Sequence, residues 1–273
     1  MANYDISKYV DMKPTELRAL VRKGEVKIPT AGMCAGYAQA NLAVLPKEYA
    51  DDFRVYAEKN PFPVPILEIT ENTPLTHLMA ADGNILTDIP EYFVYRDGKL
   101  VDRINDASAL WEEGFVGFLI GCSFSFEEAL MKAGIEMRHI ATGRNVPMYK
   151  TNIMTNPVGP FEGPMVVSMR PMTPEQADIA FKITEAMPNV HGAPIHIGDP
   201  ASIGISDIMK PDFGEAVDIY EGEVPVFWPC GVTPQAAIAN AKPPIAIAHS
   251  PGHMFITDIL NTEINGFLEK LKK

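Results

Sequence analysis

Three segments of the sequence share one pattern, in which an apolar strand runs into a short polar turn and then into a helix or a sharp loop. The strands are residues 117–120, 224–230 and 245–248, and the turns that follow them are residues 121–125, 231–235 and 249–254. In an open α/β sheet, the ligand crevice lies outside the carboxyl ends of the strands. The pattern therefore predicts an α/β fold in which three polar turns, distant in sequence, converge on one site.

Shorter signals predict the other elements of the fold. Residues 14–22 have the apolar spacing of a helix that ends at Gly24, and residues 64–69 form a strand. Asp97-Gly98 marks the turn of a hairpin over residues 92–99. These elements fit a main domain in which helices and strands alternate.

A separate β-α piece follows in the middle of the chain. Residues 163–170 read as a strand, and Thr173 with Gln176 forms a capping box that opens a helix ended by Pro188. We predict that residues 141–189 form a smaller inserted α+β domain. Residues 1–140 and 190–273 then form a three-layer αβα main domain.

The composition limits the partners. Of the 273 residues, 47% are hydrophobic, and 35 acidic against 23 basic residues give a formal charge of −12. That charge repels phosphate backbones and anionic membrane surfaces, so we expect neither nucleic acid nor a membrane as a partner. No apolar run approaches the roughly 18 residues of a membrane helix, and residues 1–5 lack the basic start of a secretory signal. We expect a cytoplasmic protein that acts on a small molecule, as a monomer or a homo-oligomer.

The cysteines and histidines do not form a metal-ligand pattern. The three cysteines are widely spaced and include no C-x-x-C pair, which argues against a disulfide framework and a structural zinc site. His249 and His253 have i, i+4 spacing, but Pro251-Gly252 breaks the helix that would place both rings on one face. We expect free thiols, no metal and no cofactor.

The turn at residues 121–125 carries two serines and a cysteine, and each has two interpretations. Ser125 with Glu128 fits a capping box, whereas Ser123 and Ser125 beside free amides at a helix start fit a site for a carboxylate or an oxyanion. A serine nucleophile is weakly supported, because Ser125 stands where the G-x-S-x-G elbow needs glycine. Cys122, like Cys230, lies at a helix start where the dipole favours a thiolate nucleophile, although buried free cysteine is the commoner role.

Two histidines and several charged residues are further candidates. His191 and His196 lie in a segment rich in Gly and Pro, which suits either proton transfer or hydrogen bonding to backbone. Arg138 and Arg170 each end an apolar run, a position suited to bidentate carboxylate recognition or to a structural salt bridge. For Arg144 the salt bridge is favoured. Asp88, Asp199 and Asp212 are candidates for acid or base chemistry, with turn roles equally open.

Several long motifs together resemble the D-glutamate cyclase family, whose bacterial members are named as hydro-lyases. The motifs occupy residues 31–42, 120–130, 138–139, 145–149, 166–171, 191–196, 230–235 and 251–254. The resemblance extends from about Pro14 to Asp258. It implies an α/β main domain with a smaller α+β domain, and an enzyme that eliminates water. In the reaction type of the family, D-glutamate closes to 5-oxo-D-proline as its amine attacks the side-chain carboxyl carbon.

One position departs from the family pattern. The family has an arginine before the Thr-Asp of the Thr87-Asp88-Ile89-Pro90 motif, and this chain has Leu86. If that arginine selects the substrate, this chain prefers a different one.

We assign roles by residue type and turn position. Arg138 and Arg170 clamp the carboxylates, Ser123 and Ser125 hold the oxyanion, and His191 or His196 moves protons. Cys122 is a further catalytic candidate. The other substrate-binding candidates are Tyr149, Cys230, Gln235, His253 and Thr233, which is also expected to be the N-cap of a helix that begins at Pro234.

Two other functions remain open at this point. The first is a non-catalytic protein that binds a small carboxylate in the same clustered turns. The second is a thiol- or metal-dependent hydrolase.

Overall fold

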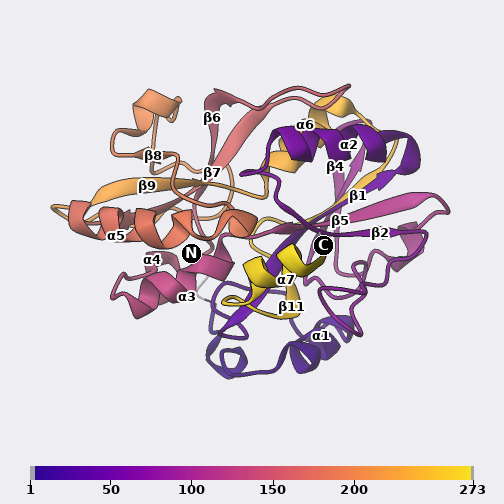
Figure 1. Cartoon of the computed structure of the whole chain (residues 1–273), viewed down its shortest axis with the longest axis horizontal. Coiled ribbons are helices and arrows are strands. Elements are labelled where there is room, and N and C mark those ends of the chain that lie inside the picture. Colours follow the sequence, from indigo (N-terminus) through magenta and orange to yellow (C-terminus); the bar gives the residue numbers. More distant parts are fainter. Residues whose placement is uncertain (1–3, 272–273) are drawn as a thin grey trace.

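The computed structural model of the chain describes residues 4–271, which form two β-sheets with helices packed around them. Figure 1 shows the two sheets side by side, with α2 (Lys47–Lys59) over the larger sheet and α5 (Pro174–Glu185) beside the smaller one. Every pairing between the named strands is antiparallel. None of the helices in residues 4–271 is both long and apolar enough to span a bilayer.

The larger sheet is built around one long strand, β1. Its order is β2-β5-β1-β10-β3-β4, and β11 also pairs with β1. The strands are β1 (Tyr37–Pro46), β2 (Ile66–Glu71), β3 (Tyr92–Arg96), β4 (Lys99–Ile104), β5 (Phe115–Gly121), β10 (Ala246–His249) and β11 (Phe255–Leu260). Because β5 and β10 both run antiparallel to β1, they run parallel to each other, and both end at the same edge of the sheet.

Both faces of β1 are buried. Leu42 and Val44 join an apolar cluster on one face, and Ala43 and Leu45 join a second cluster on the other. Phe53 of α2 and Ile238 of α6 (Thr233–Ala241) belong to this second cluster. The central strand β1 is therefore held between two apolar clusters, and this packing fixes its position in the sheet.

The smaller sheet has the order β6-β7-β9-β8. Its strands are β6 (Met148–Met154), β7 (Pro164–Met172), β8 (His196–Ile197) and β9 (Val224–Pro229). The remaining helices are α1 (Pro14–Arg22), α3 (Phe124–Lys132), α4 (Arg138–Ala141) and α7 (Ile264–Leu271), with 3₁₀ turns at Ser7–Tyr9, Ser108–Leu110, Pro188–Val190 and Pro200–Ile203.

Several sequence predictions are confirmed. The helix over residues 14–22, the hairpin at Asp97-Gly98 and the capping box at Thr173 are all present, and the strand predicted at 64–69 lies two residues later, at Ile66–Glu71. The mixed α/β class is confirmed, but the strands of both sheets are antiparallel rather than the parallel strands of an open α/β sheet. The second sheet takes strands from residues 148–229, whereas residues 141–189 were expected to form the insert. The three-layer arrangement and the inserted domain remain predictions.

Two buried histidines couple this fold to pH. The Leu42 N–H donates to Nδ1 of His249, the last residue of β10, at 3.1 Å, and Nδ1 of His191 lies 2.7 Å from the Phe62 carbonyl. Burial lowers the pKa of both rings from 6.5 to about 4. Both side chains are therefore neutral in the folded protein at neutral pH.

We predict a loss of stability on acidification between about pH 6.5 and pH 4. In this window the unfolded chain binds protons on these rings and the folded chain does not, so stability is complete above pH 6.5 and falls as pH drops towards 4. His249→Asn should reduce the slope of the free energy of unfolding against pH by about 1.4 kcal/mol per pH unit. Urea denaturation at stepped pH measures it, and His77→Asn, at an exposed ring, is the matched control. An unchanged slope for His249→Asn would contradict the assignment.

Candidate functional site

The three polar turns meet in the structure. Cys122 after β5, Cys230 after β9 and Met254 after β10 belong to one buried apolar cluster. Gly231 packs directly on β1, because a Cβ there would lie 2.0 Å from Nδ2 of Asn41. That amide in turn donates to the Gly121 carbonyl at 2.6 Å. The ends of strands from both sheets therefore close on the amino-terminal part of β1.

The two cysteines of this junction are buried. Each Sγ accepts the backbone N–H two residues later, Phe124 for Cys122 and Val232 for Cys230. Burial raises the pKa of both thiols, to about 11 for Cys230, and raises the pKa of Cys34 to about 12. At neutral pH the thiol forms dominate, and a nucleophilic thiolate is disfavoured at every cysteine.

A buried ionic network lies beside the junction, between α3 and β7. The Arg170 guanidinium is fully buried and donates to the Glu127 carboxylate, to Ser168 Oγ at 2.6 Å and to Ser123 Oγ at 3.0 Å. The guanidinium also lies 5.6 Å from the Trp228 ring centre. Arg170 and Ser123, two predicted site residues, are therefore in contact. These N–H groups of Arg170 donate to protein groups and not to a ligand.

Glu127 is the residue of this network that sequence reasoning missed. Burial alone would raise its pKa, but interactions with His139 and Arg170 together lower it, so the carboxylate is ionised. Oε1 faces His139 Nε2 at 3.2 Å, while Oε2 has no hydrogen-bond partner among residues 4–271. The only local feature around Glu127 is the sequence Ser125-Phe126-Glu127, and this sequence is also typical of an ordinary helix start.

The predicted capping box at Ser125 is wrong. The helix α3 begins at Phe124, so Ser125 lies inside its first turn, and its Oγ accepts the Gln39 N–H of β1 at 2.9 Å. The expected N-cap at Thr233 is also displaced by one residue, because Val232 is the N-cap and α6 begins at Thr233. Both hydroxyls bind neighbouring strands, since Thr233 Oγ1 accepts the Val166 N–H at 3.0 Å.

Other predicted site residues connect elements of the fold. Arg138 donates to Glu136, Glu223 and the Asp218 carbonyl, which joins α4 to the loop before β9. Gln235 links Tyr95 to the His249 carbonyl. Tyr149 donates to the Ile208 carbonyl at 2.6 Å, and His196 Nε2 lies 2.7 Å from the Asp199 carbonyl on the smaller sheet. Leu86 packs in the core of the larger sheet. The roles predicted for these residues in substrate binding and catalysis remain predictions.

A polar cleft opens where the loop after β10 faces the loop before β6 and the loop before β9. Its volume is about 440 Å³. The loop Ser250–His253 and the start of β3 form one side, and Phe213, which bridges Met148 of β6, lies on the other. The polar side chains that line it are Tyr4, Lys27, Glu91, Arg103, Asn145, Asp212, Glu215, Ser250 and His253.

The floor of the cleft is buried and its rim carries cations. Asn145, Ser250 and His253 are each at most 9% exposed, whereas Lys27 and Arg103 are exposed. Within the described part of the chain, neither cation has a carboxylate within 4.0 Å. Arg103 lies over the Phe93 ring at 4.8 Å. Two positive groups are therefore free to bind anionic groups of a ligand.

The floor groups are held by the chain around them. Asn145 Nδ2 donates to the Pro251 carbonyl at 2.9 Å, and its buried Oδ1 has no partner among residues 4–271. Residue 252 must be glycine for this approach, because a Cβ there would lie 2.2 Å from Oδ1. Ser250 Oγ donates to Glu91 Oε1 at 2.6 Å.

His253 completes the floor as a neutral imidazole. Burial lowers its pKa, against the opposing effects of Glu91 and of nearby backbone carbonyls. The predicted candidates that gather in the cleft are therefore His253 and Asp212, while Lys27, Glu91 and Arg103 were missed. Within residues 4–271 no three His, Cys, Asp or Glu side chains are placed as metal ligands.

Comparison with known proteins gives the family. A family model described as D-glutamate cyclase matches residues 116–258. The chain belongs to the D-glutamate cyclase family. Its relatives include proteins named "Putative hydro-lyase" from Bacillus licheniformis, 56% identical over 91% of this chain and 95% of the relative, and from Clostridium beijerinckii, 56% identical over 94% and 98%. A relative from Bacillus subtilis, YcsI, carries the same description, at 56% identity over 91% and 97%.

A comparison with solved structures finds a distant similarity. A nitrogen repressor-like protein from Methanococcus jannaschii covers 86% of this chain and 91% of its own, at 10% identity and a TM-score of 0.33. Its similarity to this member of the D-glutamate cyclase family is too low to bear on structure or function.

We predict that the Arg170 network contributes strongly to stability. Arg170→Met leaves the buried Glu127 carboxylate without its main cation and should lower the free energy of unfolding by about 3–5 kcal/mol. The matched control is Arg54→Met, which removes a partly exposed pair with Glu71 and should cost less than about 1 kcal/mol. Urea denaturation of the two variants makes the comparison, and equal losses would contradict the assignment.

Proposed function

We propose that this protein is a hydro-lyase that closes D-glutamate to 5-oxo-D-proline in the polar cleft. The reaction type comes from the family, and the relatives' names give the same general class. The observation that carries the placement is the pair of exposed cations, Lys27 and Arg103, at the rim of a cleft whose floor includes the buried His253.

The cleft carries charges of both signs, as glutamate does: Lys27 and Arg103 are cations, and Glu91, Asp212 and Glu215 are carboxylates. The substrate has two carboxylates and one ammonium group, and the cleft offers two cations at its rim. The Glu91 carboxylate, which lines the cleft, is an acceptor for the ammonium. Free glutamate is small enough for a cleft of about 440 Å³, which leaves room for water.

The chemistry balances on the substrate's own atoms. The ammonium loses two protons, its nitrogen bonds to the side-chain carboxyl carbon, and one carboxylate oxygen takes both protons and leaves as water. A neutral His253 can accept the first proton and return it to the departing oxygen. A cation beside that carboxylate stabilises the tetrahedral oxyanion, and binding holds amine and carboxyl in attack geometry.

Turnover of glutamate tests this proposal. Proton NMR of D-glutamate incubated with the protein should show 5-oxoproline, with L-glutamate as the stereochemical control. Lys27→Ala and Arg103→Ala should each raise KM by about tenfold or more, because a charge-assisted hydrogen bond is worth about 1.5–3 kcal/mol. Matched controls are Lys23→Ala and Arg96→Ala, exposed cations outside the cleft. Saturable binding without product would favour a carboxylate-binding protein, and neither product nor binding would overturn the placement.

His253→Gln tests the proton-transfer role. The variant should lower kcat by about 100-fold or more while leaving the thermal melting temperature close to that of the parent protein. The lowered pKa of His253 places protonation of the ring below pH 6.5, so the parent should lose kcat on the acid side of that pH and the variant should not show this limb. Identical pH profiles for kcat in the two proteins would contradict the role.

A further inference from the structure

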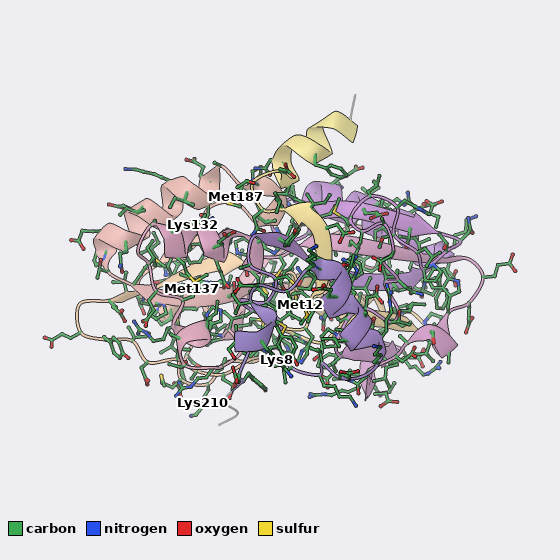
Figure 2. The ribbon with its side chains drawn as sticks, turned by 90° about the horizontal axis from the view of Figure 1, so that it is seen from below. Lys8, Met12, Lys132, Met137, Met187 and Lys210 are labelled. Carbon is green, nitrogen blue, oxygen red and sulfur yellow. The ribbon has the colours of Figure 1, made fainter. Side chains whose placement is uncertain are left out.

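A second pocket lies between the N-terminal segment and α3, away from the cleft. Its volume is about 180 Å³, and Ile6, Met33, Phe124 and Ile140 give it largely apolar walls. In Figure 2 the labels Lys8 and Met12 mark the N-terminal segment and Lys132 marks the end of α3, the two parts of the chain that contribute Ile6, Val10, Glu127 and Met131 to the pocket. Among residues 4–271, no lysine or arginine lines this pocket. It therefore differs in chemical character from the polar cleft.

The polar floor of the pocket is a carboxylate with an unused oxygen. Glu127 is 1% exposed and lines the pocket, and its Oε2 has no partner among residues 4–271. The other oxygen, Oε1, is held by Arg170 and lies 3.2 Å from His139, which fixes the group from behind. Leaving a buried acceptor unsatisfied is costly, so the site favours a donor that can enter from the pocket.

Glu128 and Gln39 complete the polar part of the wall. Lys132 Nζ lies 2.6 Å from Glu128 Oε1, and Asn261 Nδ2 donates to Glu128 Oε2 at 3.3 Å, so both oxygens of Glu128 already have a partner. The Gln39 side-chain amide is bonded to Thr30 on both sides. Glu127 is therefore the group that selects the ligand.

We propose that this pocket binds a small primary alkylammonium ion. The ammonium donates to Glu127 Oε2, and the alkyl chain packs against the apolar walls. A cavity of about 150 Å³ holds one benzene molecule, so a ligand of about five or six non-hydrogen atoms fills this pocket. A free carboxylate is disfavoured, because it would meet the carboxylates of Glu127 and Glu128, and no lysine or arginine among residues 4–271 lines the pocket.

Calorimetric titration with n-butylammonium chloride tests the proposal on the full chain, without reference to turnover. The parent protein should bind it saturably, and n-butanol and sodium butyrate should each bind at least about tenfold more weakly. Absence of saturable heat with n-butylammonium, or equal affinity for n-butanol, would overturn the proposal. The outcome is independent of whether glutamate is a substrate.

Variants assign the site. Glu127→Gln should weaken n-butylammonium binding by about tenfold or more, and the matched control Glu128→Gln should change it less than about threefold. Because Glu127→Gln also removes the partner of Arg170, Met131→Trp provides a second test: it narrows the pocket from the exposed side of α3 and should abolish binding. Unchanged affinity in both Glu127→Gln and Met131→Trp would overturn the assignment.

Discussion

The pairing of β1 on both of its edges is the constraint on which the rest of the structure depends. Its ten residues are almost all buried, with β5 on one edge and β10 and β11 on the other. Because β5 and β10 both pair antiparallel with β1, they run in the same direction although they are not neighbours in the sheet. The polar turns that follow them therefore lie at the same edge of the larger sheet. Asn41 then ties Gly121 to the glycine after β9, which brings the smaller sheet to the same place.

Two pockets of opposite chemical character lie on either side of the segment that leads into β1. The cleft has exposed cations above a polar floor, and the inner pocket has apolar walls around two carboxylates, of which Glu127 has an oxygen without a partner among residues 4–271. Thr30 lies between them, since it binds the Gly252 carbonyl behind the cleft and the Gln39 side chain on the wall of the inner pocket. Separation of the charges lets one chain present a site for an anionic ligand and another for a cation, although its net charge is −12.

Local sequence signals predicted the elements whose stability is local. The helix at residues 14–22, the Asp97-Gly98 turn and the Thr173 capping box depend on neighbours in sequence, and all are present. The Ser125 cap failed because a tertiary partner, the Gln39 N–H, competes for the same hydroxyl. Convergence of the polar turns was predictable from the pattern, although the parallel sheet on which the argument rested is absent.

The charged groups of the site were harder to predict. Lys27 and Arg103 come from a loop and an edge strand with no motif around them, and only the fold places them in one cleft with His253. Glu127 does lie in a recognisable motif, but that motif is the pattern of a helix start and so gives no sign of a buried ionic network. Which partner a side chain finds 40 or more residues away, as Arg170 finds Glu127 with a separation of 43, is set by packing and not by local sequence.

We place the carboxylate substrate in the polar cleft and not in the pocket at Glu127. A crystal structure of the protein grown with 5-oxo-D-proline tests this placement most directly, because the two locations lie on opposite sides of Thr30. We expect the ligand in the cleft, with its carboxylate on Lys27 or Arg103 and its ring beside His253. A ligand bound against Glu127, with the cleft unoccupied, would contradict it.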